Sequence, residues 1–429
     1  MWSALVLTVP ACEWEMPGLD FGPFCWRVGF EIKTRSHSRQ QAFRKQARVD
    51  TSVCLTARDS NDEQSESEGQ MTTRRELISQ GIGLMAATAV TRSFVSESLM
   101  GQAKFVASPV DPMQLVDPQF RATLQSIVGP DSPPTEWTTA MLPQIREGMK
   151  GLARPLLPAP AIVKRMIPGP KGAPEVPLYI TGATAGASKP AVLHIHGGGF
   201  IAGSAADSRR DIQELAANHD CVAISVDYRL APETPFPGSL EDNYTALLWM
   251  YSNAAELGID HSRIAIKGES AGGGHAAALA IAARDRGEVP LCLQVLLYPA
   301  LDDRTGSTTP VPPYIGHYIW TAASNRFGWT SLLGKPAGST QPPAGSVPAR
   351  VENLAGLPPA WIGVGSVDLF ANEDMEYGRR LVQAGVSTEL HLVPGGFHGF
   401  DLFVPQAPLS VAFAEGWNAA LSRAFAPRT

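Results

Sequence analysis

Short apolar runs alternate with longer amphipathic stretches from about residue 160 to the end of the chain. The apolar runs have the length of β-strands and lie at residues 163–168, 176–180, 191–196, 221–227, 263–266, 293–298, 360–364 and 388–393. Stretches of helical character lie between or after them, at residues 208–218, 240–253, 276–283, 373–384 and 409–424. The run 221–227 is almost uninterrupted in its apolar character, as expected for a parallel sheet buried on both faces. The alternation predicts an α/β protein with one doubly wound, mostly parallel sheet of about eight strands.

Two segments interrupt this alternation and are expected to form a helical cap over a site. Residues 111–150 have the pattern of two short helices separated by a turn at 129–134. Residues 302–349 are rich in Pro, Gly and Ser with aromatic interruptions, which indicates a second insertion. Cap elements are therefore predicted near 104–160 and 302–349 of a domain that spans 104–429. Five aromatic side chains of the second insertion either line a pocket or pack within the cap, and both readings stay open: Tyr314, Tyr318, Trp320, Phe327 and Trp329.

The first hundred residues lack the pattern of a folded domain. The larger part of residues 1–70 is polar with little periodicity, so it is predicted to be a disordered extension. At Met71 the pattern changes. Arg74 and Arg75 are followed by a mildly apolar run at 77–90, which resembles a twin-arginine export signal. An amphipathic helix after a charged pair is the alternative.

Export signals stand at the true N-terminus of a protein. We therefore expect translation to start at Met71, with residues 71–103 as a twin-arginine-like signal segment and residues 1–70 absent from the native protein. On this expectation the protein is exported, to the periplasm or outside the cell. Otherwise it is cytoplasmic.

Composition argues against several classes of protein. Hydrophobic residues make up 44% of the 429-residue chain, which is enough for a full core. The formal net charge of −6 provides no basic surface for nucleic acid. No stretch reaches the roughly 18 consecutive apolar residues of a membrane-spanning helix. Cys221 and Cys292 stand at the edges of apolar runs and are predicted to be buried thiols, neither a disulfide framework nor metal ligands.

The strongest chemical motif is Gly-Glu-Ser-Ala-Gly at residues 268–272, between a predicted strand and a predicted helix. A strand, a Gly-x-Ser-x-Gly turn and a helix together form a nucleophile elbow. The turn is so sharp that side chains at Gly268 and Gly272 would clash with a neighbouring strand or helix. The pattern alone is weak, and an ordinary glycine-rich junction is the alternative. In this setting it predicts Ser270 as a nucleophile.

A serine nucleophile needs a general base, and His398 is the predicted one. It stands in a glycine-flanked loop directly after the run 388–393, so it can fold back towards Ser270. His391 lies within that run and is expected to pack or to point to solvent. His275 follows the serine by five residues, about 140° around the helix, and cannot easily face it. The other histidines precede the predicted acid: His37, His194, His196, His219, His261 and His317.

The base in turn needs an acid that orients it, and Asp368 fits best. It ends the loop that leaves the run 360–364, between the serine and the histidine in the chain. This order, Ser then Asp then His, is that of one large class of hydrolases. Glu373 and Asp374 are rivals, but they stand at a predicted helix start, where acidic residues commonly favour the helix dipole.

Acyl transfer also needs N–H donors for the oxyanion. Three consecutive glycines follow the run 191–196, and they let the backbone approach a substrate without Cβ obstruction. The N–H groups of Gly198, Gly199 and Ala271 are the predicted donors. A glycine triplet alone is more often a flexible turn, so this prediction depends on the elbow. His196 is expected to brace the loop by hydrogen bonding.

Together these motifs resemble the hormone-sensitive-lipase-like, bacterial family IV, esterases of the α/β-hydrolase superfamily. The resemblance runs from about Asp111 to the C-terminus and is carried by His-Gly-Gly-Gly-Phe at 196–200, Asp-Tyr-Arg-Leu-Ala-Pro-Glu at 227–233, the elbow at 268–273, Asp-Leu-Phe at 368–370 and His-Gly-Phe at 398–400. It implies the α/β-hydrolase fold and a carboxylesterase acting on a small-molecule ester with a short- to medium-chain acyl group. It also implies a structural role for residues 227–233 and a triad without metal or organic cofactor, made of Ser270, Asp368 and His398.

The chain departs from the family pattern at four positions. Glu269 stands where Asp is frequent, and Asn372 stands where Asp often follows the catalytic acid. Gly274 replaces a common Asn, and His275 replaces an apolar residue. Asn372 is still expected to cap the helix that begins there. None of the four belongs to the triad, and they leave the substrate preference open.

Other functions stay open as alternatives. A catalytically inactive ligand-binding protein on the same fold would lack a working histidine, whereas His398 is present. A peptidase is disfavoured because the glycine-triplet oxyanion hole is the esterase version. If the protein were a scaffold, the presence of three dispersed chemical motifs would be a coincidence. The sequence does not decide whether the protein forms a homodimer through an edge strand.

Overall fold

The computed structural model describes residues 110–129 and 137–427. The predicted extension at 1–70 and the predicted signal segment at 71–103 lie outside the described residues.

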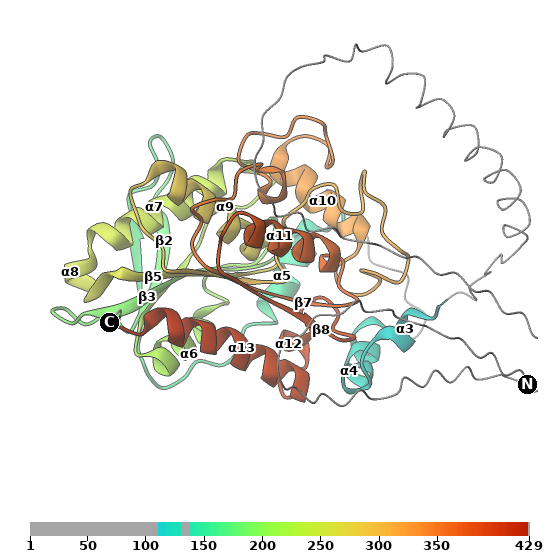
Figure 1. The fold of residues 1–429 in the computed structure, drawn as a ribbon, viewed down its shortest axis with the longest axis horizontal. Helices are drawn as coiled ribbons and strands as arrows, with labels where there is room; N and C mark the ends of the chain where they lie inside the picture. Colours follow the sequence, from blue (N-terminus) through green and yellow to red (C-terminus); the bar gives the residue numbers. More distant parts are fainter. Residues whose placement is uncertain (1–109, 130–136, 428–429) are drawn as a thin grey trace, which may run out of the picture. The chain divides into compact units, whose positions relative to one another are not determined.

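In the described part of the chain, eight strands form one sheet in the order β1-β2-β4-β3-β5-β6-β7-β8 (Figure 1). Strand β2 is antiparallel to both of its neighbours, and all other neighbouring pairs are parallel. The strands are β1 (Ile162–Ile167), β2 (Val176–Thr181), β3 (Lys189–Ile195), β4 (Val222–Val226), β5 (Ile259–Glu269), β6 (Leu293–Leu297), β7 (Ala360–Gly365) and β8 (Thr388–Val393). Each overlaps one of the eight predicted runs, so the prediction of a mostly parallel α/β sheet is confirmed.

Helices cover both faces of this sheet. Figure 1 shows α7, α9 and α11 on one face and α6 and α13 on the other. The α-helices are α3 (Pro112–Leu115), α4 (Pro118–Val128), α5 (Leu142–Lys150), α6 (Arg209–His219), α7 (Gly238–Ser252), α8 (Ala254–Leu257), α9 (Ala271–Arg286), α10 (Ala322–Leu333), α11 (Ala371–Gln383), α12 (Phe400–Phe403) and α13 (Pro408–Phe425).

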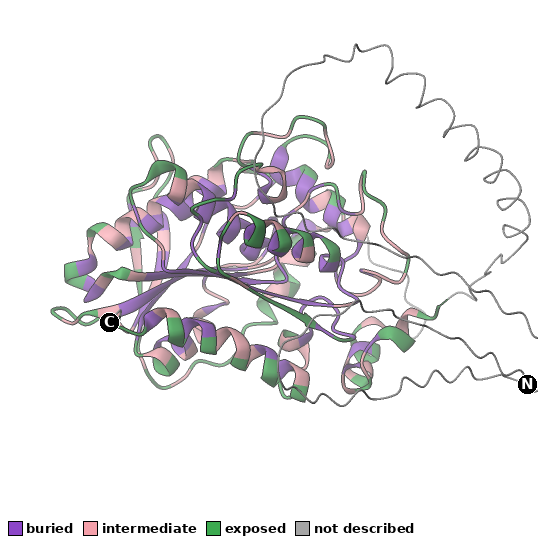
Figure 2. Ribbon diagram, in the orientation of Figure 1, coloured by how far each residue is buried: buried purple, intermediate pink, exposed green. Residues whose placement is uncertain are grey.

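Buried side chains gather in two clusters, one on each face of the sheet. The central strands are largely buried, although β5 exposes His261 and Ser262 near its start, and the helices expose their outer faces (Figure 2). Strand β4 is buried at every residue, as its uninterrupted apolar character predicts. Strand β8 lies at the edge of the sheet and exposes residues 389–392.

The insertion between β6 and β7 contains helix α10, which the sequence does not predict because its surroundings are rich in Pro, Gly and Ser. The helix starts where Thr321 Oγ1 accepts a hydrogen bond from the Ser324 N–H at 3.2 Å. An ion pair of 2.7 Å between Arg350 and the fully buried Asp303 holds the two ends of the insertion together. Trp329 is 1% exposed and packs against Phe200, so this aromatic side chain belongs to the core.

Asn372 does not cap a helix, contrary to the prediction. Helix α11 begins one residue earlier, at Ala371, and no side chain caps its start. Instead, the Phe370 N–H donates a hydrogen bond of 3.0 Å to Asp368 Oδ1. The predicted acid thus shapes the loop that leaves β7, because its own carboxylate satisfies the backbone there.

Within residues 110–129 and 137–427, no helix is both long enough and apolar enough to cross a lipid bilayer.

Candidate active site

The elbow between β5 and α9 holds Ser270 in a conformation that L-residues seldom adopt, with φ 56° and ψ −122°. The flanking glycines make this turn possible. A Cβ at Gly268 would lie 2.2 Å from the Gly272 carbonyl oxygen, and a Cβ at Gly272 would lie 2.1 Å from the Ile195 carbonyl oxygen on β3. The predicted clash with a neighbouring helix and strand is therefore present at both positions.

Ser270 and Asp368 both lie within hydrogen-bonding distance of His398, although the three residues are far apart in the sequence. The Ser270 Oγ is 2.9 Å from His398 Nε2, and His398 Nδ1 is 2.8 Å from Asp368 Oδ2. Asp368 is fully buried after β7, and His398 follows β8. The imidazole is enclosed by the rings of Phe370 and Tyr298, with centroid distances of 5.3 and 5.1 Å.

The rival acids point elsewhere. Glu373 Oε1 accepts hydrogen bonds from the backbone N–H groups of Leu301 at 2.7 Å and Asp302 at 3.1 Å. Burial raises the pKa of Glu373 well above its usual range. Asp374 is fully buried, and neither of its oxygens has a hydrogen-bond partner among the described residues. Of the three acids, only Asp368 contacts the imidazole of His398.

The rival histidines are also occupied by packing. His275 is buried against the rings of Phe200 and Tyr228, and burial followed by the nearby His196 lowers the pKa of His275 to about 3. His391 stacks on Trp361 and leaves 43% of its side chain exposed, so it both packs and meets solvent.

The glycine loop after β3 lies against the elbow. Gly198 and Gly199 have φ of 120° and 62°. A Cβ at Gly199 would lie 2.3 Å from the Trp320 ring. Among the residues that the structure describes, no hydrogen bond from the backbone N–H of Gly198, Gly199 or Ala271 to another protein group is found. These three groups are therefore free to donate to a ligand.

His196 braces this loop by hydrogen bonding, as the sequence predicts. Its Nδ1 donates a hydrogen bond of 2.8 Å to the Gly197 carbonyl. The Tyr228 hydroxyl donates to the His196 carbonyl at 2.7 Å, and the two rings stack with centroids 4.2 Å apart. Asp227 accepts a bond from the Ala205 N–H at 2.9 Å. Two residues of the Asp-Tyr-Arg-Leu-Ala-Pro-Glu stretch thus fix the loop below the serine.

Glu269 is a residue of this site to which the sequence assigns no role. Its Oε1 accepts a bond from the Gly197 N–H at 3.2 Å, and its Oε2 lies 3.1 Å from His194 Nε2. Burial by itself would raise the pKa of Glu269, but His194 and Lys267 outweigh burial and lower it. In the sequence, Glu269 stands out only because it replaces the Asp that is frequent at this position. Its hydrogen-bond partners lie on β3 and in the loop after it, far away in the chain.

A cavity of about 440 Å³ opens at Ser270 and His398 and lies within the range of small-molecule sites. Both cap segments contribute to its wall through Trp137 and Trp320, whose rings meet edge to face at 5.0 Å. Among the five aromatic residues of the second insertion, Trp320 is the one that lines this cavity. Besides Ser270 and His398, its polar lining residues are Arg154, His196, Ser204, Asp207, Ser208, Asp211, Lys267, Glu269, Tyr298, Asp401 and Ser410.

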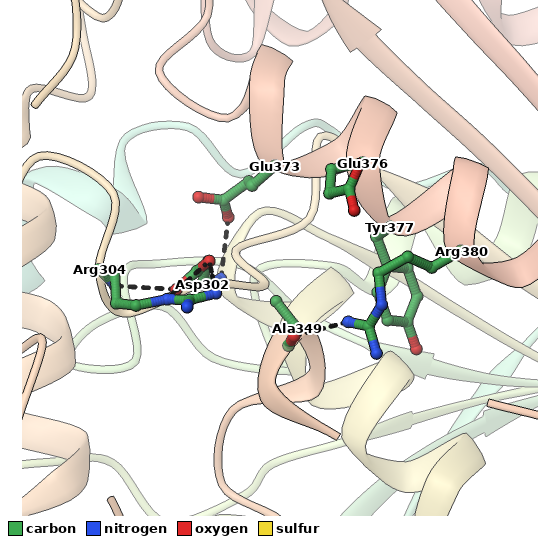
Figure 3. Close-up of a pocket in the computed structure, with 7 residues that line it drawn as sticks. All are labelled: Asp302, Arg304, Ala349, Glu373, Glu376, Tyr377 and Arg380. Carbon is green, nitrogen blue, oxygen red and sulfur yellow. Dashed lines mark hydrogen bonds and ion pairs between the residues drawn. The ribbon is translucent and has the colours of Figure 1, made fainter. Parts of the chain in front are cut away.

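A second, smaller cavity of about 260 Å³ lies between α11 and the second insertion (Figure 3). Its arginines are already paired with protein groups, whereas Glu373 Oε2 is buried without a hydrogen-bond partner among the described residues. Arg304 pairs with Asp302 at 2.7 Å, and Arg380 donates to the Ala349 carbonyl at 2.6 Å. It shares no lining residue with the cavity at Ser270. This cavity is therefore a structural junction that anchors the insertion to α11.

In the described ranges, His, Cys, Asp and Glu side chains do not gather in any group of three that could hold a metal ion.

Comparison with known proteins identifies the family. A family model described as the alpha/beta hydrolase fold matches residues 192–402, the stretch that contains Ser270, Asp368 and His398. The esterase LipI of Mycobacterium tuberculosis is 35% identical over 262 residues, which cover 60% of this chain and 80% of LipI. The chain belongs to the α/β-hydrolase family. The carboxylesterase NlhH of the same species is 36% identical over 239 residues, covering 55% of this chain and 74% of NlhH.

Solved structures of α/β-hydrolases agree with this assignment. A bacterial heroin esterase has a TM-score of 0.64 at 34% identity and covers 74% of this chain and 100% of its own. An esterase of Pyrobaculum calidifontis has a TM-score of 0.61 at 30% identity, covering 72% of this chain and 98% of its own. The predicted resemblance to hormone-sensitive-lipase-like esterases, the predicted fold and the prediction of a hydrolase are thereby confirmed.

Proposed function

We propose that this α/β-hydrolase is a carboxylesterase that cleaves short- to medium-chain acyl esters through a Ser270–His398–Asp368 triad. One observation carries the proposal. An unbroken hydrogen-bond chain runs from the buried Asp368 through His398 to the strained Ser270, at 2.8 and 2.9 Å. The names of the relatives LipI and NlhH support the same class of reaction.

The first half-reaction follows from the direction of these bonds. Because Asp368 accepts from the Nδ1–H of His398, Nε2 is the nitrogen that can take the proton of Ser270. The Oγ attacks the ester carbonyl carbon, and the carbonyl oxygen becomes an anion. The N–H groups of Gly198, Gly199 and Ala271 donate to that anion. His398 then gives its proton to the leaving alkoxide, which departs as an alcohol and leaves an acyl-enzyme.

The second half-reaction repeats these steps with water. His398 takes a proton from water, and the resulting hydroxide attacks the acyl carbon. The same N–H groups stabilise the second anion. When it collapses, His398 returns the proton to Ser270 Oγ, and the carboxylic acid is released. The buried Asp368 stabilises the imidazolium that forms in both halves.

The size of the cavity supports the preference for short and medium acyl chains. Its volume is about 440 Å³, and the rings of Trp137 and Trp320 form part of its lining. A cavity of this size accommodates short and medium acyl chains, whereas long chains would have to extend beyond it.

The test is hydrolysis of a series of p-nitrophenyl esters from acetate to decanoate by the purified protein. We expect the highest kcat/KM at or below the medium-chain members. Ser270→Ala should abolish turnover, and Asp368→Asn should lower kcat by on the order of 10³–10⁴ because the imidazole loses its orienting anion. A folded protein that hydrolyses none of the esters would favour the inactive binder instead.

We also propose export of the protein, on the grounds of Arg74, Arg75 and the apolar run that follows them. Intact-mass analysis of the protein from its native host tests this. A mature chain that begins at or after residue 90 supports export, and one that retains residues 1–70 contradicts it.

A further inference from the structure

The cavity at Ser270 has an excess of acidic side chains. Four carboxylates line it, and two basic groups, Arg154 and Lys267, accompany them. Both basic groups are already paired. Arg154 binds Asp211 and also Glu214, the latter at 2.7 Å. Lys267 Nζ lies 3.5 Å from Glu269 Oε2.

The other two carboxylates, Asp207 and Asp401, have no ion pair with a described Lys, Arg or His. Asp207 accepts a hydrogen bond of 2.6 Å from the Ser204 hydroxyl, which is a neutral partner. Asp401 shares a hydrogen bond with the Tyr298 hydroxyl, and its Oδ1 is buried without a partner among the described residues. Such a buried acceptor without a partner is unfavourable unless something binds it, and in this pair of carboxylates that holds for Asp401 Oδ1.

A second and independent feature of the cavity is its aromatic wall. Trp137, Trp320, Tyr298 and Phe403 line it. Tyr298 packs edge to face on His398 at 5.1 Å, so the wall reaches the imidazole. Aromatic faces attract organic cations through the ring quadrupole, and they recognise quaternary ammonium groups in particular.

Neither feature alone selects a ligand, but both favour the same chemistry. A carboxylate on the substrate would be repelled by Asp207 and Asp401. A neutral alkyl group would use the rings but would gain nothing from the two carboxylates. An alkylammonium group fits both, because its charge attracts the carboxylates and its methyl groups contact the rings.

We propose that this cavity selects esters that carry a positively charged ammonium group, with Asp207 and Asp401 supplying the attraction. This inference rests on the proposed esterase function and names its substrate class. The charge acts on binding of the ester before chemistry, so its effect is expected mainly in KM.

The test compares two acetate esters of matched shape. Acetylcholine carries a quaternary nitrogen, and 3,3-dimethylbutyl acetate has carbon in its place. We expect the wild-type kcat/KM for acetylcholine to exceed that for the neutral ester by about 10-fold or more at low ionic strength, and to fall towards it as salt screens the charges. The assays use pH 8, since burial raises the pKa of Asp401.

Charge-removing variants locate the effect. Asp207→Asn and Asp401→Asn should each lower the ratio of the two kcat/KM values several-fold. Glu415→Gln is the matched control, because Glu415 is exposed on α13 and does not line the cavity. It removes one negative charge without changing the ratio. If Asp401→Asn fails to fold, the ratio for Asp207→Asn and the salt dependence of the wild type still test the proposal.

A wild-type ratio of one or less overturns the inference, as does a ratio that both Asn variants leave intact. Preference for a carboxylate-bearing ester such as monomethyl succinate overturns it as well. In these cases turnover of the neutral ester leaves the esterase function standing. If neither acetate nor any p-nitrophenyl ester is hydrolysed, the proposed function itself fails.

Discussion

The carboxylate of Glu269 accepts a hydrogen bond from the backbone N–H of Gly197 at a distance of 3.2 Å. This bond joins the residue before the nucleophile to the first glycine of the oxyanion loop, across two neighbouring strands. His194 steadies the other carboxylate oxygen at 3.1 Å. The geometry between Ser270 and the N–H donors therefore depends on a side chain that bonds to Gly197 and His194 and lies outside the triad.

Removing this bond should slow the reaction more than it weakens substrate binding. We expect Glu269→Leu to lower kcat by about 10- to 100-fold, the effect of losing a hydrogen bond to a charged group, with a smaller change in KM. Glu269→Gln keeps an acceptor for Gly197 and should retain more of the activity. Steady-state kinetics on a p-nitrophenyl ester separates kcat from KM, and an unchanged kcat in the Leu variant would contradict a positioning role.

Gly199 is predicted to tolerate no side chain. A Cβ there would lie 2.3 Å from the Trp320 ring, so Gly199→Ala must displace the loop or the ring. We expect kcat to fall by on the order of 10²–10³, as when an oxyanion donor is lost. Gly186→Ala is the control, since Gly186 has a similarly positive φ of 77° but open space around it.

The two glycine variants distinguish strain from collision. Both bear the cost of a positive φ, which is about 1–2 kcal/mol, and the collision with Trp320 adds to it in Gly199→Ala, so thermal melting should show the larger loss in that variant. Only Gly199→Ala should lose activity. Equal activities of the two variants would contradict the steric explanation.

His275 should make the protein sensitive to acid. Burial lowers its pKa to about 3, whereas an unfolded chain has a value near 6.5. Between these pH values His275 binds a proton in the unfolded state but not in the folded state. The free energy of unfolding therefore falls as pH falls from 6.5 towards 3. We expect His275 to account for about 1–3 kcal/mol of the loss between pH 7 and pH 4.

The measurement is urea unfolding across this pH range. His275→Leu should flatten the profile, because Leu has no proton to bind. His261→Leu serves as the control, since His261 is exposed and its replacement should not change the slope. Parallel profiles for wild type and His275→Leu would refute the assignment.

The ion pair of Asp303 and Arg350 should hold the cap insertion in place. Asp303 is fully buried, and burial raises its pKa even though Arg350 opposes that rise. Arg350→Met would leave an uncompensated buried carboxylate, so we expect a loss of about 3–5 kcal/mol of unfolding free energy at neutral pH.

An exposed ion pair provides the comparison for Arg350. Arg379 and Glu376 pair at 2.7 Å with more than half of each side chain exposed, so Arg379→Met should change the stability much less than Arg350→Met. Chemical denaturation of both variants checks the difference. Similar losses would mean that Arg350 does not anchor the insertion.

The sequence by itself determined the strands, the main helices and the three residues proposed for catalysis. Apolar runs of strand length and the glycine pattern at 268–272 are local signals, because sterics and side-chain periodicity act over a few residues. The order Ser, Asp, His along the chain then followed from where each residue leaves its strand. The distances of 2.9 and 2.8 Å join the residues that this reasoning selected.

Only the tertiary structure decided which groups meet from distant parts of the chain. Glu269 and Gly197 are 72 positions apart, and their bond exists because β5 and β3 are neighbours in the sheet. Asn372 carries a good capping side chain, yet the backbone starts α11 at Ala371 and leaves it unused. The carboxylates around Ser270 likewise come from separate helices, strands and loops. No local sequence pattern shows that they lie together, because their contacts form only when the core packs.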